Sequence, residues 1–246
     1  MKDDGAALGK RLSELAERAD RQGRAICSEF LDLAEQDVLL RLRLRVPHVL
    51  YGGCEAAERR VAVFGAEEPT GGELALLRIA PLNARFADEL THRDFLGALM
   101  SLGVRRSTLG DIFTDGSEAY LFCLPSVAAL IIDELSEVRR TRISVTRAAA
   151  VPEGLAAPPE PQSITLASGR LDAAVAAIYD LSRSESAELF EARRVFVNSR
   201  LTENRAAELR AGDIVSVRGL GRFVWEGING EIRRGRLRAT VRIYGR

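Results

Sequence analysis

The 246-residue sequence predicts an α+β protein built from several modules. Apolar residues at helical spacing alternate along the chain with short apolar runs that are typical of strands. Clusters of glycine and proline separate these runs. A segment rich in alanine and proline, 148–162, predicts a linker between a longer N-terminal part and a shorter C-terminal part.

Residues 1–58 predict a helical N-terminal segment. Leu8, Leu12 and Leu15 recur at helical spacing, and the pattern ends at Pro47.

Residues 59–147 predict the element order β-β-α-β-β-α-β, beginning with a strand at "RRVAVFG". The first helix is expected to begin after Thr91 as N-cap, with Asp94 completing a capping box, and to end at Gly103. The second is expected to open at Pro125. Two helices on one face of an antiparallel sheet predict a ferredoxin-like or RNA-recognition (RRM-like) fold.

Residues 163–246 predict two short helices followed by short strands. Leu171, Val175 and Ile178 form one helical stripe, and the second helix is expected to be capped by Ser182 or Ser184. A strand then enters a tight turn at 198–199, and glycines separate the remaining strands.

Charge is unevenly distributed although the whole chain is neutral. From Ser168 onward there are 15 arginines and 10 acidic residues, a net charge of +5, so the rest carries −5. Lys2 and Lys10 are the only lysines, so basic contacts can be planar and bidentate. This asymmetry indicates a basic module that binds a polyanion.

Four blocks of the C-terminal module resemble the S4 RNA-binding domain: "RLDAAV" (170–175), "SRSESAELF" (182–190), "RRVFVNSRL" (193–201) and "LRAGDIVSV" (209–217). The resemblance implies two short helices on a small sheet, with RNA phosphates along the helices and the hairpin. It implies RNA-facing positions at Arg170, Ser182, Arg183, Ser184, Arg193, Arg194, Asn198, Arg200 and Arg205.

The residue types suit this role independently of the resemblance. A helix N-terminus favours phosphate, hydroxyls donate to it, and arginine adds a planar fork. The alternatives are helix capping for the serines and a solvated charge for each arginine. A basic tail flanks the cluster and comprises Arg222, Arg233, Arg234, Arg236, Arg238 and Arg242.

Further blocks resemble the bacterial YlmH family: "FLDLAEQDVL" (30–39), "YGGCEAAERRVAVF" (51–64), "HRDFLGALMSLGVRRSTLGDI" (92–112) and "TLASGRLDAAV" (165–175). The resemblance implies RNA binding in ribosome-associated quality control, on large ribosomal subunits obstructed by nascent-chain tRNA, with rRNA or tRNA as the ligand. It also implies a link to cell division. Arg93, Arg105 and Arg106 in the middle block either touch RNA or pair with acids.

An enzyme is the competing hypothesis. "GRLD" at 169–172 resembles the catalytic motif of pseudouridine synthases, but here Asp172 opens an alanine-rich helix. A third hypothesis is an adaptor in cell division. We expect no catalysis, no cofactor, no metal site and no small-molecule substrate, since the chain lacks a P-loop, a catalytic triad pattern and clustered metal ligands. The charged start "MKDDGAALGK" and the lack of a long apolar run predict a cytoplasmic protein without a membrane partner.

Overall fold

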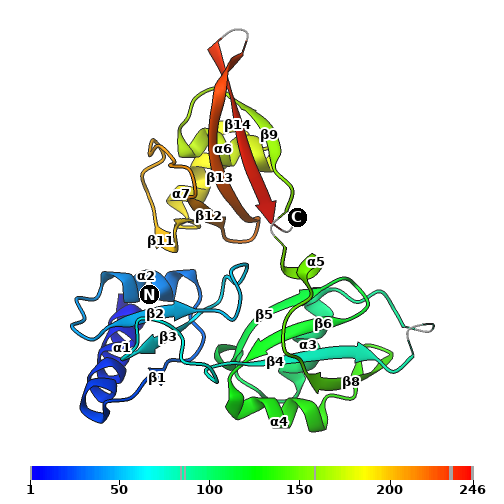
Figure 1. Ribbon diagram of the computed structural model, residues 1–246. Coiled ribbons are helices and arrows are strands. Elements are labelled where there is room, and N and C mark those ends of the chain that lie inside the picture. The colour runs from blue at the N-terminus through cyan, green and yellow to red at the C-terminus, as the bar shows by residue number, and fades with distance from the viewer. Residues whose placement is uncertain (1, 84, 86, 158, 233–234, 245–246) are drawn as a thin grey trace. The chain divides into compact units, whose positions relative to one another are not determined.

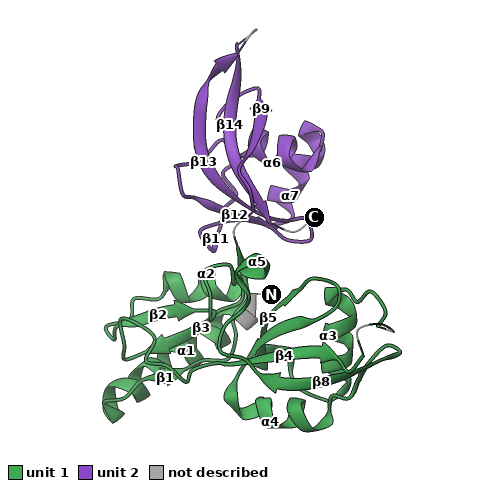
Figure 2. Ribbon diagram, turned by 45° about the vertical axis from the view of Figure 1, so that its right-hand side comes forward, with its two compact units in different colours: residues 1–157 green, residues 158–246 purple. Residues whose placement is uncertain are grey.

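The computed structural model describes residues 2–83, 85, 87–157, 159–232 and 235–244. The chain forms two compact units, 1–157 and 158–246 (Figure 2). The boundary predicted between residues 58 and 59 therefore lies inside the first unit. No helix in the described ranges is both long enough and apolar enough to span a membrane.

The N-terminal part of the first unit combines helices with a small sheet (Figure 1). Its helices are α1 (Lys2–Gln22) and α2 (Leu33–Arg41). Its antiparallel strands, in the order β1-β3-β2, are β1 (Ile26–Cys27), β3 (Val61–Phe64) and β2 (His48–Tyr51). The expectation of helices alone over 1–58 missed β1 and β2, because two- and four-residue strands are too short to show a period.

Strand β3 corrects a second expectation. We expected it in the sheet of the middle domain, but it pairs with β1 and β2 instead. All four of its residues are buried. Ala62 and Phe64 pack with α1 in one hydrophobic cluster, and Val61 and Val63 pack in another. Burial on both faces gives a continuous apolar run, which does not reveal the partner strand.

A five-stranded antiparallel sheet follows, in the order β5-β6-β4-β8-β7. Its strands are β4 (Ala75–Pro81), β5 (Leu109–Thr114), β6 (Ala119–Cys123), β7 (Glu137–Val138) and β8 (Thr141–Arg147). Helices α3 (His92–Ser101) and α4 (Pro125–Glu134) pack on one face of this sheet, and the 3-10 turn η2 (Arg106–Thr108) precedes β5.

The predicted ends of α3 and the predicted start of α4 are confirmed. Thr91 is the N-cap of α3, and its N–H donates to the Asp94 carboxylate at 2.8 Å. Gly103 follows the C-cap with φ +77°, a left-handed conformation that favours glycine. Pro125 is the first residue of α4.

The opposite face of the five-stranded sheet is covered by the N-terminal part. Tyr120 and Phe122 point to that face and are 7% and 6% exposed. Phe30 packs there as well, directly over Gly110, where an added Cβ would lie 2.6 Å from the Phe30 ring. Gly110 is therefore the strand position that admits Phe30.

The segment predicted to be a linker begins on this same face. The Ala148 N–H donates to Leu76 O at 2.9 Å, and Val151 and Leu155 pack on the cluster that contains Tyr120. A short helix, α5 (Glu153–Ala156), ends just before the unit boundary. Residues 148–157 thus belong to the first unit.

The second unit places two helices on one face of a six-stranded antiparallel sheet. The helices are α6 (Leu171–Tyr179) and α7 (Arg183–Glu191). The strands, in the order β11-β10-β12-β13-β14-β9, are β9 (Gln162–Leu166), β10 (Val195–Val197), β11 (Arg200–Leu201), β12 (Ile214–Val217), β13 (Gly221–Ile232) and β14 (Arg236–Tyr244). Trp225, Phe223, Val175 and Phe190 lie in the core between the layers. The stripe predicted on the first helix is buried.

Candidate nucleic-acid interface

A groove lies at the N-terminal ends of α6 and α7 and is lined by three of the arginines predicted to face RNA. Arg170 precedes α6, Arg183 opens α7, and Arg205 lies in the loop between β11 and β12. The volume of the groove is about 360 Å³. Its other lining residues are mostly small: Ala167, Ser168, Asp172, Ala173, Ala176, Ser186 and Ala187. Guanidinium groups in a groove lined by small side chains can reach and bind an anion such as phosphate.

Arg170 forms a bidentate pair with Asp172 inside the groove. Its Nε donates to Oδ1 at 3.0 Å and its Nη2 donates to Oδ2 at 2.7 Å. These hydrogen bonds are the main reason why the pKa of Asp172 lies below its ordinary value and the pKa of Arg170 lies above its own. Asp172 therefore stays ionised and offsets part of the charge of Arg170.

Backbone hydrogen bonds bring the Arg205 loop to the start of α6. The Leu171 N–H donates to Ala207 O at 2.9 Å, and the Asp172 N–H donates to Arg205 O at 3.0 Å. The first two N–H groups of α6 are therefore occupied, and phosphate binding here depends on side chains rather than on this helix terminus.

A buried serine joins the two helices of the groove. Ser186 is 1% exposed, and its Oγ donates to Asp172 O at 2.9 Å. This bond fixes α7 against α6 and so holds Arg183 near Arg170. Sequence reasoning overlooked Ser186; the available signal was a serine among the apolar positions of an amphipathic helix.

Ser182 caps α7, and Ser184 lies beside it in the first turn. Ser182 Oγ accepts the Glu185 N–H at 3.2 Å, and the Glu185 carboxylate accepts the Ser182 N–H at 2.8 Å. Ser184 Oγ lies 3.0 Å from Ser182 Oγ. Of the two caps expected, Ser182 is the N-cap, with Glu185 completing a capping box, and both serine hydroxyls are exposed.

Arg183 and Arg205 carry the least compensated charge of the groove. Both side chains are exposed, and neither forms an ion pair with a carboxylate in the described part of the chain, although the charge of Arg205 contributes to the lowered pKa of Asp172. A cation that is held near a groove without an acidic partner can bind an incoming anion without first breaking an ion pair.

The hairpin between β10 and β11 carries two more predicted residues. Asn198 and Ser199 both adopt positive φ, 50° and 63°, as a tight hairpin turn requires. The Asn198 amide donates to Asp213 Oδ1 at 2.8 Å and accepts the Ile214 N–H at 2.9 Å. Asn198 therefore holds the turn to the start of β12, whereas Arg200 is exposed on β11.

The paired arginines before β10 have different environments. Arg193 forms an exposed ion pair with Glu203 at 3.3 Å. Arg194 Nε and Nη2 both donate to Arg218 O, at 2.9 and 2.5 Å. An added Cβ at Gly219 would lie 2.5 Å from Arg194 Nη2, so Gly219 leaves space for this guanidinium. Neither arginine lines the groove.

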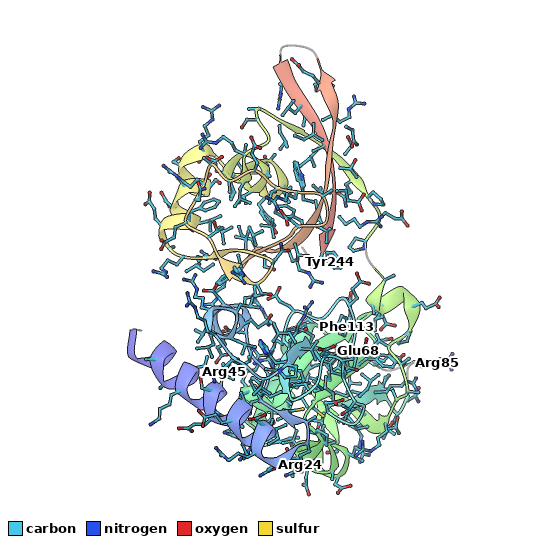
Figure 3. The ribbon with its side chains drawn as sticks, turned by 60° about the vertical axis from the view of Figure 1, so that its left-hand side comes forward. Arg24, Arg45, Glu68, Arg85, Phe113 and Tyr244 are labelled. Atoms are coloured by element: carbon cyan, nitrogen blue, oxygen red, sulfur yellow. The ribbon has the colours of Figure 1, made fainter. Side chains whose placement is uncertain are left out.

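The arginines of the basic tail also differ in their environments: some are exposed and others have partners. Arg236 and Arg238 are exposed on β14, whereas Arg242 pairs with Glu226. The Arg222 guanidinium lies 4.2 Å from the centre of the ring of Tyr244, which Figure 3 labels at the end of β14. Arg233 and Arg234 lie outside the described residues.

From the sequence, two roles were possible for three arginines of the middle block: contact with RNA or pairing with acids. Of these three, Arg105 forms an ion pair with Glu29. Arg106 donates to the backbone carbonyls of Leu109 and Gly110. Arg93 is exposed on α3.

The fold and the site together define an α+β protein whose C-terminal unit presents an arginine-lined groove suited to a polyanion. Comparison with known proteins finds two similarities in sequence. Residues 72–151 match a family model described as "Putative RNA-binding domain in YlmH". The chain is 29% identical over 245 residues to "Ribosome-associated protein quality control protein P2" of Bacillus subtilis (strain 168), with 97% of this chain and 95% of that protein covered. The chain is thus similar to a domain of YlmH over residues 72–151 and to this relative over almost its whole length.

A solved structure, "Cell division protein ylmH from Streptococcus pneumoniae", is 18% identical, with a TM-score of 0.48 and coverage of 59% of this chain and 91% of that chain. The residues matched by the family model span the five-stranded sheet with α3 and α4, and not the C-terminal unit. Sequence reasoning had placed RNA binding in the C-terminal module.

Proposed function

We propose that the chain binds structured RNA on the ribosome as part of ribosome-associated quality control. Its ligand is rRNA or tRNA on large ribosomal subunits obstructed by nascent-chain tRNA, and it acts in the cytoplasm. The name of the Bacillus relative and the description of the matched family domain support this proposal.

The observation that carries the proposal is the groove of the C-terminal unit. Arg170, Arg183 and Arg205 come from three separate chain segments and line one surface. Ser182, Ser184 and Arg200 extend the set of exposed donors along α7 and the hairpin. Such groups contact phosphates and hydroxyls, so they recognise the shape of RNA rather than its base sequence.

The topology supports the two domain assignments made from sequence. Strands β5-β6-β4-β8 with crossover helices α3 and α4 have the order of a ferredoxin-like domain, with β7 added at one edge. Two short helices on a sheet at residues 163–246 fit an S4 domain.

We propose no catalytic role for Asp172. Both of its carboxylate oxygens accept hydrogen bonds from Arg170, and Oδ1 also accepts the Ala173 N–H at 2.9 Å. Its contacts are those of a residue that orients Arg170 and supports the first turn of α6.

Sedimentation with purified large ribosomal subunits at several salt concentrations tests the proposal. We expect the full chain to bind, with an affinity that falls as salt rises. The double variant Arg183→Gln with Arg205→Gln should reduce the slope of log affinity against log salt by about 1.5, because each lost phosphate contact contributes roughly 0.7–0.9.

The matched control is Arg21→Gln with Arg41→Gln. It removes the same net charge by changing two exposed arginines of the first unit, which pair with Glu17 and with the buried Asp37. We expect the control to bind as the unmodified chain does. No binding at low salt, or equal slopes for both double variants, would contradict the proposal.

A further inference from the structure

A second concentration of positive charge lies in the first unit, where the side chains of Arg59 and Arg106 come together beside β5. Arg59 Nε donates to Leu109 O at 3.1 Å, and Arg106 Nη1 donates to the same oxygen at 2.6 Å. The two guanidinium groups therefore lie within a few ångströms of each other. Arg59 Nη2 also donates to Phe30 O at 3.3 Å, and both side chains are half-buried.

Backbone carbonyls orient these two cations without neutralising them. The negative charge of Asp111 acts on Arg106, and its Oδ2 accepts the N–H groups of Glu58 and Arg59 at 2.5 and 2.9 Å. In the described ranges, no carboxylate forms an ion pair with the guanidinium of Arg59 or Arg106. Two like charges held together without an ion-paired carboxylate leave a net attraction for an anion.

The protonation of the neighbouring groups preserves this charge at pH 7. Burial, with the nearby charge of Arg59, lowers the pKa of Arg106 to about 10, so Arg106 remains a cation. Burial and the charge of Arg106 lower the pKa of His92, the first residue of α3, so His92 adds no charge.

The domain that contains Arg106 cannot bind RNA through its sheet face as RNA-recognition domains do. Those domains stack bases on exposed aromatic side chains of the sheet. Here Tyr120 and Phe122 are covered by Phe30 and by the segment after β8. Phe113, labelled in Figure 3, packs edge to face against Phe122 within the same cluster, with the two ring centroids 6.3 Å apart. A contact with RNA must use another surface of this domain.

We propose that Arg59 and Arg106 form a phosphate-binding site for the RNA backbone, in addition to the groove of the C-terminal unit. This inference rests on the proposed function. One phosphate that bridges the two guanidinium groups accepts hydrogen bonds from both and offsets their mutual repulsion. The site joins the N-terminal part, through Arg59, to the domain matched by the family model.

Arginine-specific modification of the full chain by a phenylglyoxal reagent tests the site without a substitution. The chain is modified alone and when bound to purified large ribosomal subunits, and modified peptides are quantified by mass spectrometry. We expect modification of Arg59 and Arg106 to fall at least fivefold in the complex, while Arg21 and Arg41 react equally in both samples.

The outcomes separate this inference from the proposed function. If the chain does not sediment with the subunits, both are wrong. If it sediments but Arg59 and Arg106 react as in the free chain, or do not react in the free chain because solvent cannot reach them, only this inference is wrong. As a second measurement, Arg59→Gln with Arg106→Gln should bind at least tenfold more weakly than Arg21→Gln with Arg41→Gln. Equal affinity of the two variants, measured on chains with native far-UV circular dichroism, would overturn the site.

Discussion

Replacing Gly110 by alanine tests the packing that joins the N-terminal part to the five-stranded sheet. An added Cβ would lie 2.6 and 2.7 Å from two atoms of the Phe30 ring and 3.0 Å from Phe122 O. Ordinary carbon contacts are about 3.5–4.0 Å. Phe30 is 1% exposed, so its ring cannot turn toward solvent. The φ of Gly110 is not positive, so steric overlap is the main penalty.

The magnitude follows from two opposing effects. Overpacking of a filled core costs about 1–3 kcal/mol. Replacing glycine by alanine restricts the unfolded chain and returns about 0.4–1 kcal/mol. We expect the free energy of unfolding of the first unit to fall by about 1–2 kcal/mol, which corresponds to a lower urea midpoint by roughly 0.5–1 M.

Urea unfolding followed by far-UV circular dichroism measures this change. Trp225, the only tryptophan, is buried in the second unit, so its fluorescence follows that unit separately. Gly97→Ala is the matched control, because an added Cβ in the middle of α3 meets nothing within 4 Å. It should stabilise by about 0.5–1 kcal/mol. An unchanged or higher midpoint for Gly110→Ala would refute the packing of Phe30 on β5.

Three further predictions concern the cap, the groove and the thiols. Ser182→Ala removes the α7 cap and should lower the stability of the second unit by about 1 kcal/mol in Trp225-monitored unfolding, with a smaller loss for Ser184→Ala; equal losses would contradict the capping box. The lowered pKa of Asp172 means that its stabilisation is present above its unfolded pKa, near 4, and is lost as pH falls through the folded value. Asp172→Asn should therefore weaken the acid destabilisation of the second unit, and identical pH profiles would contradict the Arg170 pair. Burial raises the pKa of Cys27 to about 11 and that of Cys123 to about 12, so both should react slowly with a disulfide reagent at pH 8 until the chain unfolds; fast native reaction would show that they are accessible.

Helix ends were predictable because their signals are local. The Thr91 and Ser182 capping boxes, the left-handed Gly103 and the opening Pro125 each depend on residues within one turn of the helix. The partner of a strand depends instead on residues far along the chain. Strand β3 was therefore assigned to the wrong sheet, and the two short strands that pair with it were missed.

The composition of the candidate site was predictable, but its grouping was not. The sequence places Arg170, Arg183 and Arg205 in one module, yet only tertiary contacts bring them to one groove. Sequence reasoning also could not separate Asn198, whose amide holds a turn, from an exposed cation such as Arg200. The convergence of Arg59 with Arg106 spans 47 positions of sequence and leaves no local signal.

Electron microscopy of the full chain bound to large ribosomal subunits tests the central claim most directly. We predict that residues 158–246 lie against RNA, with the side chains of Arg183 and Arg205 within hydrogen-bonding distance of phosphate oxygens. A bound particle in which the α6–α7 groove faces solvent or ribosomal protein, with no phosphate near either arginine, would contradict the account.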